Sequence, residues 1–271
     1  MERVTVRQML EAGAHFGHQT RRWNPKMRPY IYGQRQGVYI INLGKTARLF
    51  REAQDFIARI TARGEQLLFV ATKRQARDIV REEAERANMP FVAHRWLGGT
   101  LTNFKTIRGS IEKMGELETK LAPEMAARLP KKEVAYITKA HAKLIRNLGG
   151  VRHMPKMPGA MFVIDPRQEH IAIAEARRLK IPVIGVIDTN SDPDLVDYPV
   201  PANDDAMRSI RLFAAGAADA CIAGSQMGRD AFARDFEGVA GTAATDVDVV
   251  RKPRSKRKAE DEGGEQAPAA V

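Results

Sequence analysis

The chain has 271 residues, of which 44% are hydrophobic, so it can bury a substantial core in one or two domains. Its 44 Lys and Arg exceed its 33 Asp and Glu, and the resulting net charge of +11 favours a polyanionic partner over a small neutral substrate. The single cysteine, Cys221, excludes an intramolecular disulfide, and no apolar run approaches the roughly 20 residues that span a bilayer, so we expect a soluble, cytoplasmic protein.

Positive charge is concentrated near the amino terminus, where residues 1–50 carry nine Lys and Arg against two Glu. Within them, residues 15–27 mix two histidines, three cations and two large aromatic rings, which suits neither a helix face nor a regular strand. Pro25 and Pro29 keep the preceding residues extended, so residues 21–29 are predicted to form an ordered loop. Its cations and rings suit RNA phosphates and bases, although the rings could instead fill the core.

A short helix is predicted over residues 4–14 and a short strand over residues 38–42, followed by a helix that ends at Gly64. Between the strand and this helix, residues 44–46 read Gly-Lys-Thr, like the end of a phosphate-binding P-loop. That motif also needs a glycine at the position of Tyr39. We therefore do not expect a nucleotide-binding P-loop.

Residues 67–72 form a nearly continuous apolar run, which predicts a strand buried on both faces of a parallel sheet. A charged helix is expected over residues 73–87 and a further strand over residues 91–94. Residues 95–103 then place adjacent glycines between an Arg-Trp pair and a Thr-Asn pair. Because adjacent glycines allow close approach of the backbone, we interpret this stretch as a second RNA-facing segment or as a segment that locks a loop.

The alternation of strands and helices is interrupted by residues 105–148. Apolar residues recur there at three- and four-residue steps on both sides of a loop around residues 123–130, which predicts an antiparallel helical hairpin with coiled-coil-like seams. Cations on the outer faces of this arm either contact RNA or keep the arm soluble. The sequence leaves both interpretations open.

Two more apolar strands are predicted at residues 160–165 and 181–188, with helices over residues 168–179 and 206–223. This pattern predicts an α/β fold of three layers, a mostly parallel sheet with helices on both faces. The predicted divisions are a discontinuous body of residues 1–104 and 149–224, a hairpin insertion of residues 105–148, and a mobile or disordered tail of residues 225–271.

Both late strands end in aspartate, at Asp165 and Asp188, and the carboxyl edge of an open parallel sheet is where ligands usually bind. More Asp and Asn residues follow at 190–194 and 203–205. Together with His18, this acidic group could hold Mg²⁺ or Zn²⁺. The same residues could instead cap the last helix, complement its dipole and form turns.

Several long segments resemble, in order, the signature segments of the S-two family, the second protein of the bacterial small ribosomal subunit. They are HFGHQTRRWNPKM at residues 15–27, INLGKT at 41–46, RWLGGTLTN at 95–103, LGG at 148–150, and IDTNSDP at 187–193 with NDD at 203–205. The resemblance runs from residue 4 to residue 223 and leaves out the tail.

The resemblance implies a three-layer α/β body with a protruding helical hairpin and a structural, non-catalytic role. It implies binding of small-subunit ribosomal RNA between head and body, a contribution to assembly and translation, and docking of the large RNA-capturing first protein of the subunit. No cofactor would be required. The family's acidic group has been associated with a metal, which implies a structural Zn or Mg ion at Asp188, Asp204 and Asp205, with His18 as a further ligand.

We expect cations to neutralise phosphates while rings pack on RNA or brace the loop. The expected RNA-binding residues are His15, His18, Gln19, Arg21, Arg22, Trp23, Asn24, Lys26, Arg28, Lys45, Arg95, Trp96 and Asn103. An alternative is a metal-dependent phosphotransferase or hydrolase that uses the carboxyl-edge aspartates, although no nucleophile and base stand out. A free RNA-binding regulator is a third hypothesis.

Overall fold

The computed structural model describes the backbone of residues 3–243 and the side chains of residues 3–232. Of the described residues, 3–231 belong to one compact unit, and the helical residues 232–243 belong to a second. No helix within the described part of the chain is long and apolar enough to cross a membrane.

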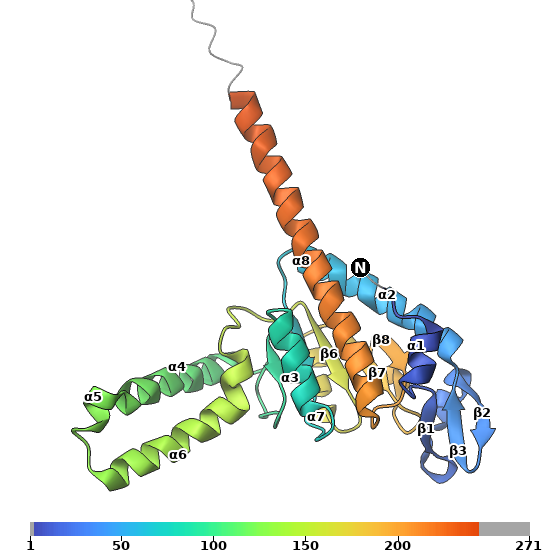
Figure 1. Ribbon diagram of the computed structural model, residues 1–271, viewed down its shortest axis with the longest axis horizontal. Helices are drawn as coiled ribbons and strands as arrows, with labels where there is room; N and C mark the ends of the chain where they lie inside the picture. The colour runs from blue at the N-terminus through green and yellow to red at the C-terminus, as the bar shows by residue number, and fades with distance from the viewer. Residues whose placement is uncertain (1–2, 244–271) are drawn as a thin grey trace, which may run out of the picture. The chain divides into compact units, whose positions relative to one another are not determined.

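A five-stranded parallel sheet forms the centre of the first unit (Figure 1). In spatial order its strands are β5 (Phe91–Val92), β4 (Leu67–Val70), β6 (Ala160–Ile164), β7 (Val183–Ile187) and β8 (Tyr198–Pro201). Phe69, Phe162 and Ile184 lie opposite one another on successive strands and form one apolar row across the sheet. Strand β8 was not predicted, because its two prolines suit only an edge strand.

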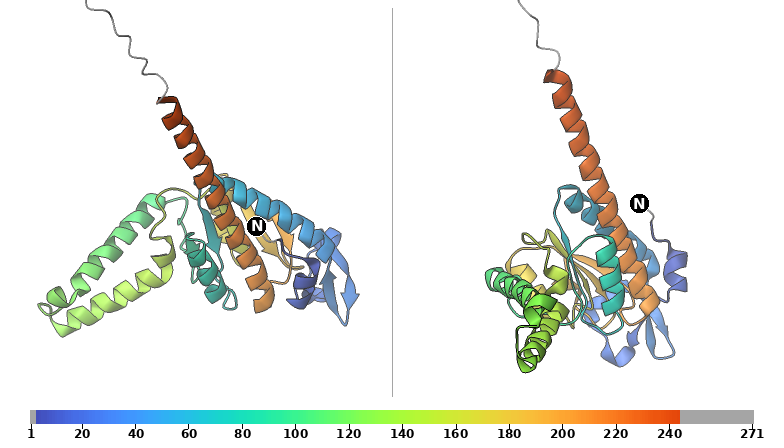
Figure 2. Two further views of the ribbon diagram at one scale, coloured as in Figure 1. Left: turned by 45° about the horizontal axis from the view of Figure 1, so that its top comes forward. Right: turned by 60° about the vertical axis from the view of Figure 1, so that its left-hand side comes forward.

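Helices cover both faces of this sheet (Figures 1 and 2). They are α2 (Leu43–Ala62), α3 (Arg77–Arg86), α7 (His170–Arg178) and the part of α8 (Met207–Ala243) that belongs to the first unit. Helices α4 (Phe104–Leu121) and α6 (Lys131–Leu148) project away from the sheet (Figures 1 and 2). Along β4, Leu67 and Phe69 contribute to a core with α2, α3 and α8. Leu68 and Val70 contribute to a second core with α7 and buried residues of α4 and α6. The predicted α/β fold with a mostly parallel sheet is therefore confirmed.

A small antiparallel sheet precedes the main one, in the order β1-β3-β2. Its strands are β1 (Phe16–Gln19), β3 (Val38–Ile41) and β2 (Ile31–Arg35). The prediction that residues 15–27 contain no regular strand is wrong for β1. Neither β1 nor β2 contains a buried residue, so the hydrophobic pattern gave little signal. The chain between them forms two 3-10 helices, η1 (Thr20–Arg22) and η2 (Pro25–Tyr30).

Helix α1 (Val6–Glu11) begins with a capping box in which the side chains of Thr5 and Gln8 each bond the backbone of the other. Helix α2 is capped by Asn42, whose side chain accepts from the N–H of Lys45. The Gly-Lys-Thr sequence therefore lies in the first turn of α2 and does not form a P-loop. Thr46 is buried and donates to the carbonyl of Pro201 at 2.6 Å.

Helices α4 and α6 lie side by side in all views, joined through the short α5 (Pro123–Ala126) (Figures 1 and 2). Met114 on α4 and Ile137 on α6 are buried, although most of both helices is solvent-exposed. Glu118 on α4 lies 3.3 Å from His141 on α6 and 2.6 Å from Arg152. The 3-10 helix η3 (Gly149–Val151) then returns the chain to the sheet.

Helix α8 corrects the predicted start of the tail, because it continues through residue 225 to Ala243. Small residues allow it to approach α2 closely. A Cβ atom at Gly224 would overlap Thr61 and the carbonyl of Ala58, and one at Gly228 would overlap the carbonyl of Ala62. Packing on α2 thus extends beyond the predicted end of the body. The remaining tail and its basic run, residues 244–271, lie outside the described residues.

Candidate RNA interface and metal site

The opening stretch, residues 15–27, is fastened to the carboxyl end of β7 through Thr189. The N–H of His18 donates to Thr189 Oγ1 at 2.9 Å, and the N–H of Asn24 donates to the Thr189 carbonyl at 2.8 Å. A Cβ atom at Gly17 would lie 2.5 Å from Thr189 Cγ2, so this approach requires glycine. The small sheet is therefore held against the carboxyl edge of the main sheet.

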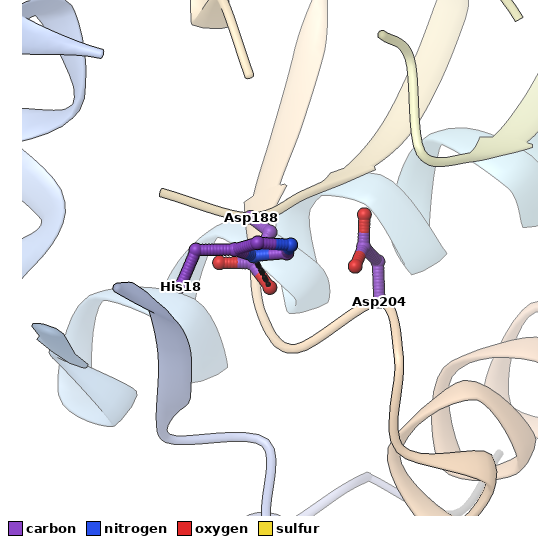
Figure 3. Close-up of side chains that lie close together, drawn as sticks. All are labelled: His18, Asp188 and Asp204. Atoms are coloured by element: carbon purple, nitrogen blue, oxygen red, sulfur yellow. Dashed lines mark ion pairs between the residues drawn. The ribbon is translucent and has the colours of Figure 1, made fainter. Parts of the chain in front are cut away.

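Three side chains from distant parts of the chain converge at this edge: His18 from β1, Asp188 after β7 and Asp204 before α8 (Figure 3). His18 Nδ1 lies 3.0 Å from Asp188 Oδ2, and His18 Nε2 lies 3.6 Å from Asp205 Oδ2. The side chains of Asp188 and Asp204 are buried. The Asp188 carboxylate favours the protonated imidazole more strongly than burial opposes it, so the pKa of His18 is raised.

Lys73 brings a positive charge to the same cluster. Its ammonium lies 2.8 Å from Asp204 Oδ1, 2.5 Å from Asp205 Oδ1 and 3.7 Å from Asp165 Oδ2. Burial acts to lower the pKa of Lys73, but the carboxylates outweigh it and raise that pKa, so the ammonium stays charged. Burial, with Asp188 and Asp165 nearby, raises the pKa of Asp204 to about 7 despite the lysine.

The donor set fits a metal ion. One ligand atom from each of His18, Asp188 and Asp204 lies within 4.8 Å of the others. Neither His18 Nδ1 nor Asp204 Oδ2 makes an aligned hydrogen bond within the described residues, although both atoms are buried. Imidazole nitrogen and carboxylate oxygen are typical zinc ligands. Asp205, also predicted as a ligand, lies at the margin, with a side chain 53% exposed and paired with Lys73.

Exposed cations follow β1 on the loops of the small sheet. Neither Arg21 nor Arg22 pairs with a carboxylate among residues 3–232, and Arg21 Nε donates to Gln19 Oε1 at 3.0 Å. Lys26 Nζ instead lies 2.8 Å from Asp192 and 2.6 Å from Asp194, so its charge is already matched within the chain. The predicted RNA-binding residues that are exposed are Gln19, Arg21, Arg22, Lys26, Arg28, Lys45, Arg95 and Asn103.

Other predicted residues brace these loops. Trp23 packs on Tyr39 with ring centroids 5.1 Å apart, and His15 packs on Phe16 at 4.0 Å. Burial lowers the pKa of His15 and favours its neutral form. The side chain of Asn24 caps η2. Their contacts favour the interpretation in which rings and amides lock the loop, while arginines remain available for phosphate.

Trp96 requires a correction, because it is only 7% exposed and cannot present its ring to RNA. Its Nε1 donates to Glu175 Oε1 at 3.0 Å. Glu175 also accepts from the N–H groups of Gly99, Leu101 and Thr102, at 2.8 to 3.0 Å. Burial would raise the pKa of Glu175, but these bonds together lower it. Residues 95–103 therefore form a locked loop around a buried carboxylate.

Three residues that hold the site together were missed from the sequence: Lys73, Thr189 and Glu175. Thr189 lies 171 residues from His18, and Glu175 lies 79 residues from Trp96, so no local pattern connects these partners. Lys73 could have been found from its place after a buried strand, because the carboxyl ends of parallel strands share an edge.

The sheet, its helices and the ion pairs at its carboxyl edge define a basic α/β protein with exposed arginines on its amino-terminal loops. Residues 9–224 match the model of the family described as ribosomal protein S2, and the chain belongs to this family.

Similar proteins cover most of the chain. It is 51% identical over 230 residues to the small ribosomal subunit protein uS2 of Solidesulfovibrio magneticus, an alignment of 85% of this chain and 89% of the relative. It is 55% identical over 227 residues to the protein of the same name from Sorangium cellulosum, covering 84% and 82%. The protein of that name from Syntrophobacter fumaroxidans is 51% identical over 221 residues, covering 82% and 81%.

Proteins of this family are structural components of the ribosome and not enzymes. The alternative of a metal-dependent phosphotransferase or hydrolase is therefore wrong. The chemistry at the sheet edge agrees with this conclusion, because Lys73 already engages Asp165, Asp204 and Asp205 in ion pairs.

Proposed function

We propose that the chain is a constituent of the small ribosomal subunit that binds the subunit's RNA between head and body and contributes to assembly and translation in the cytoplasm. The observation that carries RNA binding is the set of exposed arginines on a braced loop. Arg21 and Arg22 follow a strand fixed to Thr189, so their guanidinium groups are held on an ordered base. Ordered cations lose less conformational entropy when they bind phosphate.

The second element of the proposal concerns partners. Family membership favours neighbours among the small-subunit proteins, notably the large first protein, whose docking surface we place on the amino-terminal face. Val6 and Leu10, one turn apart on α1, are 46% and 55% exposed, and Phe16 on β1 is 49% exposed. Exposed apolar side chains on adjacent elements suit a protein contact.

We also propose that His18, Asp188 and Asp204 hold a structural Zn or Mg ion, with zinc favoured by the imidazole nitrogen. Such an ion would neutralise two buried carboxylates. The chain's own residues would link β1, the end of β7 and the turn before α8. The two buried atoms without aligned hydrogen bonds, His18 Nδ1 and Asp204 Oδ2, support this assignment.

The RNA assignment is tested by replacing Arg21, Arg22 and Arg28 together with alanine. We expect reduced incorporation into small subunits in gradient sedimentation. When RNA binding is measured directly, the slope of the log binding constant against log salt concentration should become less steep by about two to three. Each lost phosphate contact removes roughly 0.7 to 0.9 from this slope.

The matched control replaces three exposed arginines with alanine. They are Arg51 and Arg59 on α2 and Arg63 directly after it. This variant carries the same change in charge and should incorporate normally. Equal behaviour of the two triple variants would contradict the assignment of the loop. A third variant, Lys26→Ala, should weaken RNA binding less than either single Arg21→Ala or Arg22→Ala, because Lys26 is paired with Asp192 and Asp194.

A further inference from the structure

A hollow of about 810 Å³, distinct from the acidic cluster, lies between α3, β5, α6 and η3. This volume is typical of pockets that hold small ligands. Apolar side chains line part of it, among them Met89, Phe91 and Ile145, and Ile145 is 44% exposed. Gly150 packs so closely on Phe91 that a Cβ atom would overlap the Phe91 carbonyl, which fixes η3 beside the ring.

Three side chains that line this hollow each carry a buried polar atom without an aligned hydrogen bond. Gln66 Oε1, His94 Nδ1 and His141 Nε2 are buried, make no hydrogen bond within the described part of the chain, and belong to residues that line the hollow. His141 Nε2 has a carboxylate oxygen of Glu118 at 3.3 Å, but the contact is not aligned as a hydrogen bond. The side chains of Gln66, His94 and His141 place hydrogen-bonding groups in the wall of the hollow, which suits a ligand with both donors and acceptors.

The charge around the hollow is positive. Arg81 and Arg146 line it, against a single lining carboxylate from Glu85, and Arg81 also lies 3.6 Å from Asp78. Burial lowers the pKa of His94, and the guanidinium groups of Arg146 and Arg77 lower it further, which favours the neutral imidazole. Within residues 3–232, Arg146 pairs with no carboxylate. The hollow therefore offers an apolar floor, hydrogen-bonding atoms and guanidinium groups that suit an anion.

We propose that this hollow binds one unpaired nucleotide, with the base on the apolar floor and the phosphate toward Arg81 and Arg146. A base edge carries donors and acceptors that suit the side chains of Gln66, His94 and His141, and a flat ring suits contact with Phe91. Guanidinium groups bind phosphate oxygens in pairs. The preference for a nucleotide over an acidic peptide rests on the proposed RNA-binding function. The nucleotide belongs either to an RNA strand or to a free mononucleotide.

Binding is measured on the full chain by anisotropy with fluorescein-labelled hexaadenylate and by calorimetry with 5′-AMP and 5′-UMP. We expect Arg146→Glu to weaken binding at least about tenfold, as expected for the loss of a charged hydrogen-bonding partner. The matched control, Lys143→Glu, reverses an exposed charge on the same helix outside the hollow and should change affinity less than about twofold.

A second variant, Ala142→Trp, fills the hollow from an exposed helical position without changing charge and should weaken binding similarly. Binding of hexaadenylate alone identifies a nucleotide within RNA, whereas binding of both probes identifies the nucleotide unit itself. Absence of binding by wild type, equal losses for Arg146→Glu and Lys143→Glu, or preference for an acidic peptide would overturn the inference. Co-sedimentation of wild type with small subunits is scored separately, so the proposed function can stand when this inference fails.

Discussion

At the scale of single residues, buried charged groups fix the loops at the carboxyl edge of the sheet. Glu175 accepts bonds from Trp96 Nε1 and from three backbone N–H groups, and so sets the path of residues 95–103. Lys73 likewise fixes the path of the turn before α8, where it pairs with Asp204 and Asp205. In both cases, the loss of one partner would leave several buried groups unmatched, which costs more than the bond itself contributes.

Replacing Glu175 by Gln should destabilise the fold by about 2 to 3 kcal/mol at neutral pH, because an amide NH₂ group would face donors. The pKa of Glu175 is lowered in the fold, so its stabilisation is complete above the unfolded value of about 4.5 and is lost as pH falls through the folded value. Urea unfolding should therefore show the deficit of the variant shrinking below about pH 4.5. Glu116→Gln, at an exposed position on α4, is the control. A pH-independent deficit would contradict this role.

Replacing Lys73 by Met should destabilise the protein by roughly 3 to 5 kcal/mol, because the buried Asp204 carboxylate would lose its counter-charge. The double variant Lys73→Met with Asp204→Asn should recover part of this loss, since the amide carries no charge. The measurement is a double-mutant cycle by urea unfolding. Additive effects of the two changes would show that the pair does not interact.

At the scale of elements, the sequence predicted those strands and helices whose burial is continuous or periodic. The apolar run at residues 67–72 and the aspartate-ended strands became β4, β6 and β7. Strands β1 and β2 were not predicted, because they contain no buried residue and are held by pairing with β3. The topology of a parallel sheet predicted Asp165 and Asp188 at one edge, whereas the grouping of Asp204 with Asp188 came from the density of acidic residues and the family resemblance. The ion pairs of the lysine between their loops could be found only from tertiary contacts.

The far end of α8 was also not predicted from the sequence, because small residues take the place of the apolar stripe there. Gly224→Ala should destabilise the protein by about 1 to 3 kcal/mol, because the added methyl overlaps Thr61 and the Ala58 carbonyl on α2. Gly115→Ala on α4 makes the same change in open space and should stabilise by about 0.5 to 1 kcal/mol. Thermal unfolding of both variants distinguishes close packing from helix propensity. A stabilised Gly224→Ala would rule out the close contact with α2.

At the scale of the whole first unit, the strand order β5-β4-β6-β7-β8 is that of a doubly wound sheet whose order reverses between β4 and β6. Folds of this kind bind ligands at the carboxyl ends of the strands beside that reversal. Here the chain's own side chains occupy part of this position. Glu169 accepts from the N–H of Thr72 at 2.7 Å, and Lys73 reaches toward Asp165. These internal contacts narrow the usual ligand crevice to a hollow of about 190 Å³ lined by residues that include Thr72 and Glu169.

The same edge joins segments that are remote in sequence, and a metal ion there should stabilise the whole unit. Added Zn²⁺ should raise the melting temperature of the wild-type chain, because a ligand that binds only the folded state adds RT ln(1 + [Zn²⁺]/Kd) to the unfolding free energy. At about 100 times Kd this is about 2.7 kcal/mol. The increase should vanish in His18→Ala and in Asp204→Asn, which each remove one donor. His170→Ala, which changes an exposed histidine on α7, should retain it. An equal zinc response in all four proteins would place the ion elsewhere and leave His18 only its ion pairs with Asp188 and Asp205.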